Sequence, residues 1–368
     1  MTKRAIVCVS NDLSTDQRVH KTCLTLQKCG YTVTEIGRLL PNSIDLERPY
    51  STLRKKLIFN CGPLFYAELN IRFFFYLLFK KVDLIFANDL DTLLACYLAS
   101  KLRNNRLIYD SHEYFTETPE LFSRPNIQKV WKSIEYLILP HLTNIITVNE
   151  SIAKIYSSNY DIDVKVVRNI PLYKQAQTKK SLELNNVSQY KNIIIYQGAL
   201  NKGRCLENVL IAMTMVADGH LIIIGDGDLT IDLKKLSYEL NITDRVSFIG
   251  KIDGTTLHQY TRLAKIGICL LENNGLNYYY SLPNRIFDYL YAGVPVLASS
   301  FPEIKNIVEQ FKTGVLIKNN SPELIAQHIN QLLNDGFDTS HFQSIYTTLS
   351  WENEEKVLME IIQKSEQK

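Results

Sequence analysis

Short apolar segments alternate with amphipathic helical segments along the whole chain, and this alternation is the feature that most constrains the fold. In the first half the apolar segments are continuous, which is typical of parallel strands covered on both faces. They lie at residues 5–10, 32–37, 82–88, 106–111, 144–149 and 164–169. The pattern predicts a doubly wound α/β domain.

The alternation of apolar and helical segments stops at residues 171–191, a polar and charged stretch that we interpret as a linker. It then resumes with apolar segments at 192–198, 221–227, 246–250, 266–271, 294–299 and 314–318. A chain of 368 residues suits two domains. We predict two Rossmann-like domains of α/β class facing across a cleft, over 1–172 and 173–350.

The terminal segment, 351–368, is predicted to be a helix with an apolar face. We expect this helix to pack back on the N-terminal domain. The residues assigned to the apolar face are Trp351, Val357, Leu358 and Ile361.

Composition excludes several classes of protein. A net charge of +3 and the absence of a recognisable motif argue against nucleic-acid binding. The seven cysteines are scattered without metal-ligand spacing, which is typical of reduced thiols in the cytoplasm. No segment reaches the roughly 18 apolar residues of a membrane span. We predict a cytoplasmic protein that associates with the inner face of the cell membrane only if a surface segment binds lipid.

In open α/β sheets, ligands bind beyond the carboxyl ends of the strands, so the loops after the strands hold the candidate residues. The loop 10–21 contains Asn11 and Asp12 but no glycine-rich fingerprint, which disfavours a nicotinamide enzyme. His112 and Glu113 directly follow another strand. A histidine in this place either makes structural hydrogen bonds or faces a ligand.

The spacing Asp89-x-Asp91 resembles a metal-binding motif. The same spacing occurs at residues 161–163 and 226–228, so it carries little information. We predict a polar contact at Asp89 and no metal.

In the second half, residues 196–210 run from a strand through a tight turn into a helix, with Lys202 and Arg204 at the start of the helix. A guanidinium beside free backbone N–H groups suits a diphosphate. The alternative is a solvated basic turn.

The stretch SLPNRIFDYLYAGVPVLASS, residues 281–300, opens a helix with polar side chains. Pro283 fits a first helical turn, Asn284 is a capping residue type, and Asp288 lies one turn beyond it. Such a helix start can hold an anion. The alternative is an ordinary capped surface helix.

Residues 48–81 contain seven basic residues, one acidic residue and nine interleaved aromatic residues. This combination suits peripheral contact with an anionic membrane. A core helix with charged flanks explains the pattern equally well.

Together these motifs resemble the retaining glycosyltransferases of family 4, which have the two-domain GT-B fold. The family usually carries Gly-Arg-Leu-x-x-x-Lys-Gly after the first strand of its second domain. Gly198 and Leu200 match this pattern. Ala199 replaces the usual arginine, Arg204 the lysine and Cys205 the last glycine.

The family's Glu-x₇-Glu pair falls on Tyr280 and Asp288, so one carboxylate is lost and the other is one methylene shorter. The sequence SLPNRIFDY is similar to a Ser-Leu-Pro-Asn-Lys-x-x-Glu-Tyr variant of bacterial polysaccharide enzymes. We therefore interpret Tyr280 as a subfamily difference.

The resemblance implies transfer of a hexose-type sugar, with retention, from a nucleoside diphosphate sugar to a glycan or lipid-linked acceptor, in surface polysaccharide biosynthesis. It implies no cofactor and no metal. Catalytic roles fall to His112 and Arg204, and the acceptor side to Asn11, Asp12, Asp89 and Glu113. Donor binding falls to Lys202, Lys251, Tyr280, Ser281, Leu282, Pro283, Asn284 and Asp288.

Two alternatives remain from the residues. A nucleotide-sugar epimerase of the same architecture would convert the donor without an acceptor. A catalytically inactive nucleotide-sugar-binding protein would explain Ala199, Cys205 and Tyr280 as losses.

Overall fold

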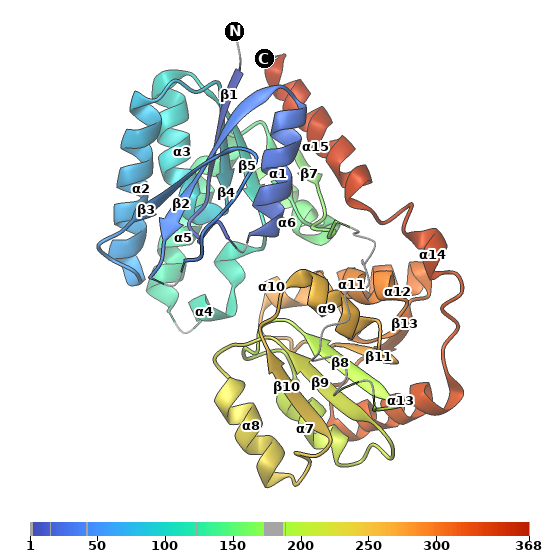
Figure 1. Ribbon diagram of the computed structural model, residues 1–368. Helices are drawn as coiled ribbons and strands as arrows, with labels where there is room; N and C mark the ends of the chain where they lie inside the picture. The colour runs from blue at the N-terminus through green and yellow to red at the C-terminus, as the bar shows by residue number, and fades with distance from the viewer. Residues whose placement is uncertain are drawn as a thin grey trace. The chain divides into compact units, whose positions relative to one another are not determined.

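The computed structural model describes residues 3–14, 16–41, 43–122, 124–172, 187 and 189–367. The chain divides into two compact units (Figure 1). One contains Met1–Asn169 and Glu352–Lys368, and the other contains Ile170–Trp351. The sequence-based boundaries were 172/173 and 350/351. Most of the predicted linker, namely 173–186 and 188, lies outside the described residues.

The first unit is built on a seven-stranded, fully parallel sheet in the order β3-β2-β1-β4-β5-β6-β7. Its strands are β1 (Lys3–Cys8), β2 (Tyr31–Leu39), β3 (Ser51–Lys56), β4 (Leu84–Asn88), β5 (Arg106–Ser111), β6 (Ile145–Thr147) and β7 (Val164–Val166). Six of them coincide with predicted apolar segments. The strand β3 was not predicted, because its sequence STLRKK is basic and lies at the sheet edge, where it needs no continuous apolar run.

Helices cover both faces of this sheet (Figure 1). They are α1 (Gln17–Lys28), α2 (Gly62–Phe79), α3 (Leu90–Arg103), α4 (Pro119–Phe122), α5 (Pro125–Ile138), α6 (Glu150–Tyr160) and the short 3₁₀ turns at Phe115–Glu117 and Leu139–His141. Within the described part of the chain, no helix combines the length and apolarity needed to cross a bilayer.

The C-terminal helix α15 (Trp351–Glu366) packs on the first unit beside α1 (Figure 1). Glu355 accepts hydrogen bonds from Thr25 and Lys28, and Glu354 accepts one from the Arg168 side chain. The predicted apolar face needs one correction. Val357 is 36% exposed, and the next turn instead buries Ile362 beside Leu358.

The second unit contains a six-stranded parallel sheet in the order β10-β9-β8-β11-β12-β13. Its strands are β8 (Ile193–Gln197), β9 (His220–Ile224), β10 (Val246–Gly250), β11 (Ile266–Cys269), β12 (Val296–Ser299) and β13 (Gly314–Ile317). Its helices are α7 (Leu206–Met213), α8 (Thr230–Glu239), α9 (Gly254–Thr261), α10 (Leu276–Tyr279), α11 (Arg285–Ala292), α12 (Pro302–Phe311), α13 (Pro322–Asp335) and α14 (Phe342–Ile345).

Two apolar clusters cover the two faces of this second sheet. One packs α7, α8 and α13 against Ile194, Tyr196 and Ile268. The other packs α9, α11, α12 and α14 against Ile193 and Ile195. Because successive side chains of β8 enter opposite clusters, the continuous apolar run seen in the sequence is explained. Both units are Rossmann-like, as predicted.

Candidate active site

Each sheet has one point at which strand order reverses, and polar residues gather at the carboxyl ends of the strands there. In the first unit the reversal lies between β1 and β4, and in the second between β8 and β11. The residues predicted from the sequence fall at these two edges.

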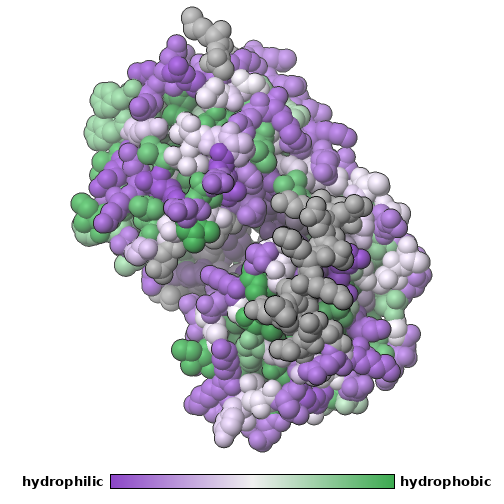
Figure 2. All heavy atoms as spheres, viewed as in Figure 1, coloured by the Kyte–Doolittle hydropathy of each residue, from purple (hydrophilic) through white to green (hydrophobic). Residues whose placement is uncertain are grey.

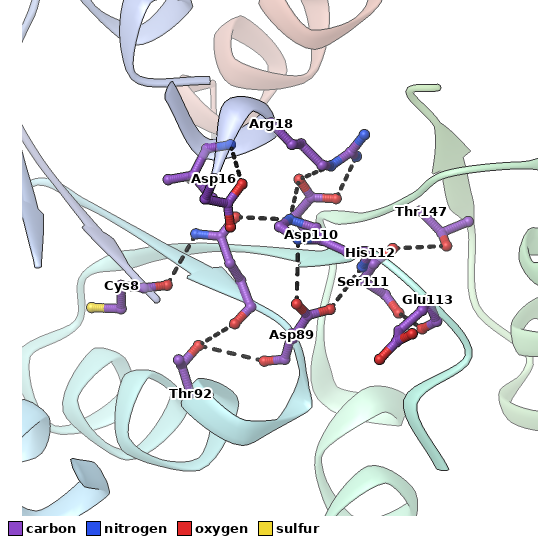
Figure 3. Close-up of polar contacts among 12 residues, drawn as sticks. Cys8, Asp16, Arg18, Asp89, Thr92, Asp110, Ser111, His112, Glu113 and Thr147 are labelled. Carbon is purple, nitrogen blue, oxygen red and sulfur yellow. Dashed lines mark hydrogen bonds and ion pairs between the residues drawn. The ribbon is translucent and has the colours of Figure 1, made fainter. Parts of the chain in front are cut away.

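His112 is fixed at the first edge by neighbours from two strands (Figure 3). Its backbone N–H donates to Asp89 Oδ1 at 2.8 Å, and its Nδ1 lies 3.3 Å from Asp89 Oδ2. Its Nε2 lies 3.1 Å from Asn88 Oδ1 and 3.4 Å from Asp110 Oδ2. The ring therefore already has polar partners at both nitrogens.

A buried arginine binds the Asp110 carboxylate that faces His112 (Figure 3). Arg18 of α1 donates to both carboxylate oxygens of Asp110, at 2.9 and 2.6 Å, and to the carbonyl of Val167 at 2.7 Å. Arg18 and Asp110 are almost fully buried. Asp110 therefore lies between the guanidinium and the imidazole, which fixes the position of His112.

The electrostatics of this cluster make His112 a cation. Burial alone lowers the pKa of His112, but the carboxylates of Asp89 and Asp110 outweigh it and raise that pKa to about 9. Burial raises the pKa of Asp89 to about 6. Although burial opposes the effect, Arg18 and His112 hold the pKa of Asp110 well below its usual range. At neutral pH His112 is a hydrogen-bond donor rather than a base.

The other first-edge candidates hold loops together. Asp12 accepts hydrogen bonds from the Ser43 hydroxyl and from the Ser14 N–H, and lies 3.7 Å from Arg54 Nη1. The Asn11 carbonyl accepts a hydrogen bond from the backbone N–H of Arg38, which lies in β2. The carbonyl of Glu113 accepts from the Ser111 hydroxyl at 2.8 Å (Figure 3).

Asp91 is also buried at this edge, and burial raises its pKa to about 6. Among the described residues, no group of three or more His, Cys, Asp or Glu side chains is arranged to hold a metal ion.

At the second edge, glycines allow three loops to approach one another closely. Gly198 N–H donates to the carbonyl of Ile224, and Gly225 N–H to the carbonyl of Gly250. A Cβ on Gly225 would lie 1.9 Å from the Gly198 carbonyl oxygen, and one on Gly227 would lie 2.4 Å from Asn201 Oδ1. Gly198 and Gly225 have φ of +132° and +137°. Only glycine fits these positions.

The loop between β8 and α7 contains Arg204, whose guanidinium lies 4.7 Å from the centre of the Tyr278 ring. The Nε of Arg204 is buried and has no hydrogen-bond partner. Gly203, with φ +84°, lets Tyr278 pack against this loop, since a Cβ there would lie 2.5 Å from the ring. The side chain of Lys202 points to solvent, and its carbonyl accepts a hydrogen bond from the Tyr278 hydroxyl. Arg204 is therefore better placed than Lys202 to bind an anion at α7.

Asp288 lies in the first turn of α11 and connects to the end of β8. The amide of Gln197 donates to Asp288 Oδ2 at 2.8 Å, and Thr261 donates to Gln197 Oε1 at 2.8 Å. This chain of hydrogen bonds orients the carboxylate at the switch point of the sheet. Gln197 was not a predicted site residue, because a polar residue at the end of an apolar strand carries no distinct sequence signal.

The residues preceding Asp288 form the turn between α10 and α11. Tyr280 is partly buried, with its ring 5.0 Å from that of Tyr279, and the Ser281 hydroxyl donates to the carbonyl of Tyr278. Leu282 packs against the apolar cluster below, and the Pro283 carbonyl accepts from the N–H of Ile286. These positions shape the turn.

The predicted capping role of Asn284 is wrong. Asn284 stands at the N-cap position of α11, but its backbone is already helical and its side chain makes no capping hydrogen bond. Its carbonyl accepts from Asp288 N–H instead. Lys251, at the end of β10, is exposed and together with the Thr230 hydroxyl helps to lower the pKa of Asp226.

The structure adds Arg285, which was not among the predicted site residues. Its side chain is 7% exposed, and its guanidinium lies 4.9 Å from the centre of the Tyr196 ring. One feature of the sequence could have indicated Arg285 as a site residue. Arg285 is a charged residue one turn before Tyr289, at the margin of the apolar face of α11.

Residues 178–347 match the family described as Glycosyl transferases group 1. An uncharacterized glycosyltransferase of Methanocaldococcus jannaschii is 24% identical over 248 residues, 61% of each chain. The N-acetyl-alpha-D-glucosaminyl L-malate synthase of Bacillus anthracis is 21% identical over 255 residues, 66% of this chain and 62% of that protein. The chain thus covers less than two thirds of the length of these relatives.

Solved structures resemble nearly the whole chain. Sucrose-phosphate synthase from Thermosynechococcus elongatus superposes with a TM-score of 0.77 at 18% identity, over 98% of both chains. HepE of Anabaena, solved in complex with UDP and glucose, gives a TM-score of 0.75 at 15% identity, over 98% of this chain and 100% of that one. The fold is GT-B. The match over residues 178–347 identifies a glycosyl transferases group 1 domain in this part of the chain.

Proposed function

We propose that this protein is a retaining glycosyltransferase that moves a hexose-type sugar from a nucleoside diphosphate sugar to an acceptor hydroxyl without a divalent metal. The observation that carries the proposal is Arg204, a guanidinium with a buried, unpartnered Nε at the start of α7. Asp288 is oriented by Gln197 at the same edge. A diphosphate beside Arg204 and a ribose beside Asp288 would use both groups.

In the proposed reaction, the bond between the anomeric carbon and the diphosphate oxygen breaks while a bond to the acceptor oxygen forms on the same face. The acceptor hydroxyl gives its proton to the departing phosphate oxygen, so no side chain acts as base. Arg204 stabilises the negative charge that develops on the leaving group. The raised pKa of His112 agrees with this scheme, since a protonated imidazole cannot take the acceptor's proton. We propose that the imidazolium, whose two nitrogens face Asp89 and Asp110, acts instead through its positive charge.

The proposal of a nucleotide-sugar donor draws support from two comparisons. HepE was solved with UDP and with UDP-glucose. A mannosyltransferase of Mycobacterium tuberculosis named as GDP-mannose-dependent is 27% identical over 116 residues, 31% of this chain. We therefore propose that the donor is a nucleoside diphosphate sugar. The experiment below identifies its nucleobase.

A thermal-shift panel of UDP, GDP, ADP, CDP and dTDP, each with and without EDTA, tests the donor site. We expect one diphosphate to raise the Tm, with EDTA making no difference. The sugar nucleotide with the same nucleobase as the stabilising diphosphate is then incubated with wild type and with Arg204→Ala. Free nucleoside diphosphate is measured with and without a lipid-linked glycan acceptor. Arg204→Ala should keep its fold and lose most turnover. Consumption of donor to an isomeric sugar nucleotide without acceptor would instead indicate an epimerase.

We further propose that the acceptor is a glycan or lipid-linked glycan at an anionic membrane surface, as in surface polysaccharide synthesis. The helix α2 supports this, because apolar residues lie on two sides of it. Phe65, Leu69, Phe73 and Leu77 are buried against the first unit, whereas Leu64, Ile71, Phe75 and Phe79 are 58, 57, 52 and 77% exposed. Figure 2 shows hydrophobic residues on the side of the first unit where Figure 1 places α2.

Basic residues lie at the C-terminal end of this exposed apolar face. Lys55 and Lys80 both lie over the ring of Tyr76, at 5.4 and 5.7 Å, and Lys81 follows. Arg54 is a poor lipid ligand, because it already contacts Asp12 and donates to the Ile44 carbonyl. Ammonium groups beside exposed aromatic rings suit an anionic interface.

A further inference from the structure

Arg285 is a buried cation without an anion. Its side chain is 7% exposed, and its Nε and Nη2 have no hydrogen-bond partner. No carboxylate forms an ion pair with it among the residues that the structure describes. A buried guanidinium with unsatisfied N–H groups is costly unless something else uses them.

Two other buried or half-buried arginines, Arg18 and Arg245, each have several hydrogen-bond partners. Arg18 donates to Asp110 and to the Val167 carbonyl. Arg245 donates to three backbone carbonyls, of Met213, Val216 and Gly219, at 2.8 to 3.2 Å. These two side chains tie loops together. Arg285 contacts the Cys269 thiol and the face of the Tyr196 ring but ties no loop through backbone carbonyls, and its Nε and Nη2 stay without a partner, so a purely structural role does not explain its burial.

The surroundings of Arg285 place it at the second edge, beside Arg204. A Cβ on the exposed Gly198 would lie 3.4 Å from Arg285 Nη1 and 3.7 Å from the Tyr196 hydroxyl, with nothing else within 4 Å. Arg285 and Arg204 both act electrostatically on the thiol of Cys269, at the end of β11, and lower its pKa against the larger effect of burial. Two guanidinium groups therefore converge on the switch point of the sheet, one from the β8–α7 loop and one from α11.

We propose that Arg285 is a second diphosphate-binding residue, which together with Arg204 holds the leaving group of the sugar nucleotide. This inference rests on the proposed function and deepens it. The open side of Gly198 gives a phosphate oxygen access to Arg285, and Ala199 brings no bulk or charge to block it. The charge of a diphosphate would satisfy two cations that otherwise repel each other.

The proposal makes opposite predictions for the empty and the bound protein. Without ligand, Arg285 is an unpaired buried charge, so its replacement by an apolar side chain of similar length should leave the Tm unchanged or raise it. With ligand, the same replacement should remove a charge-assisted contact. A structural arginine would behave in the reverse way.

The experiment compares Arg285→Met with Arg245→Met as the matched structural control and with Arg262→Met, at the C-cap of α9, as an exposed control. Each is melted alone and with the nucleoside diphosphate that stabilises wild type, its monophosphate and its nucleoside. For Arg285→Met we expect no loss of Tm without ligand. We expect its diphosphate Kd to rise by roughly tenfold or more, with the nucleoside Kd within about twofold of wild type. Arg245→Met should lower the Tm and keep the ligand affinities.

The proposal is overturned if Arg285→Met lowers the Tm as Arg245→Met does while the diphosphate Kd stays at the wild-type value. If Arg285→Met does not fold, Arg285→Gln replaces it, and an unchanged diphosphate Kd in that variant overturns the proposal equally. Failure of the proposed function looks different. In that case wild type itself gains no stability from any of the five diphosphates.

Discussion

His112 and Asp89 are joined twice, by a backbone hydrogen bond of 2.8 Å to Oδ1 and by an imidazole contact of 3.3 Å to Oδ2. Asp89 makes these contacts from a backbone with φ of +59°, which is strained for a residue other than glycine. Its side chain thus turns back to hold the loop after β5. The orientation of His112 depends on this pair and on Asp110.

The first prediction concerns pH. Because the folded-state pKa of His112, about 9, lies above its unfolded value of about 6.5, its contribution to stability is full below pH 6.5. It is lost as the pH rises to 9. The shift corresponds to at most about 3 kcal/mol of unfolding free energy. Wild type should therefore lose more stability than His112→Asn on going from pH 7.5 to pH 9.5.

The comparison starts at pH 7.5 because two buried carboxyl groups titrate below that pH. Burial raises the pKa of both Glu35 and Glu135 from 4.5 to about 7, so the stability tied to their protonation is lost as the pH rises from about 4.5 to 7, and little of this change falls above pH 7.5. Denaturant unfolding of both proteins at each pH gives the comparison. Parallel stability curves above pH 7.5 would show that His112 is not held as a cation.

The second prediction concerns Asp288. If its carboxylate accepts hydrogen bonds from ribose hydroxyls, Asp288→Ala should weaken binding of the stabilising nucleoside diphosphate by roughly tenfold or more, whereas Asp288→Glu should retain binding. The 2′,3′-dideoxy analogue provides the control, since Asp288→Ala should bind it as wild type does. Calorimetric titration measures both ligands. Equal losses for the two ligands would place Asp288 away from the ribose.

The third prediction concerns the close approach of Gly225 to Gly198. Gly225→Ala places a Cβ 1.9 Å from a carbonyl oxygen and forces the β8–α7 loop to move. It should cost about 3 kcal/mol of unfolding free energy and weaken diphosphate binding. Gly250→Ala is the matched control, because Gly250 has φ of +81° but nothing within 4 Å of its added Cβ. That variant should cost about 1–2 kcal/mol and leave binding intact.

Much of the fold could be predicted from the sequence, because continuous apolar strands and glycine- or proline-bounded helices are local signals. The edge strand β3 could not, since an edge strand does not need an apolar run on both faces. Arg204 and Asp288, both candidate site residues from the sequence, lie at the same edge of the second sheet.

The remaining site residues depend on tertiary contacts. Arg285 reads as a surface residue of an amphipathic helix, and only the packing of α11 over β8 buries it beside Tyr196. In the sequence Asp110 is one of two polar residues that end a strand, and its pairing with Arg18 joins segments 92 residues apart. No local pattern indicates either partner.

The last prediction concerns the exposed apolar face of α2 and its basic end. If this surface binds an anionic membrane, the triple variant Lys55→Glu, Lys80→Glu, Lys81→Glu should lose cosedimentation with phosphatidylglycerol-containing vesicles, and Phe75→Ser with Phe79→Ser should lose it at high salt as well. Each ammonium near an anionic surface contributes about 1 kcal/mol, so three charge reversals should suppress binding strongly. Lys235→Glu, Lys265→Glu and Lys305→Glu, all exposed on the second unit, give the same change in net charge and should bind vesicles nearly as wild type does. Equal losses in the two charge-reversal variants would mean that net charge, rather than this surface, determines vesicle binding.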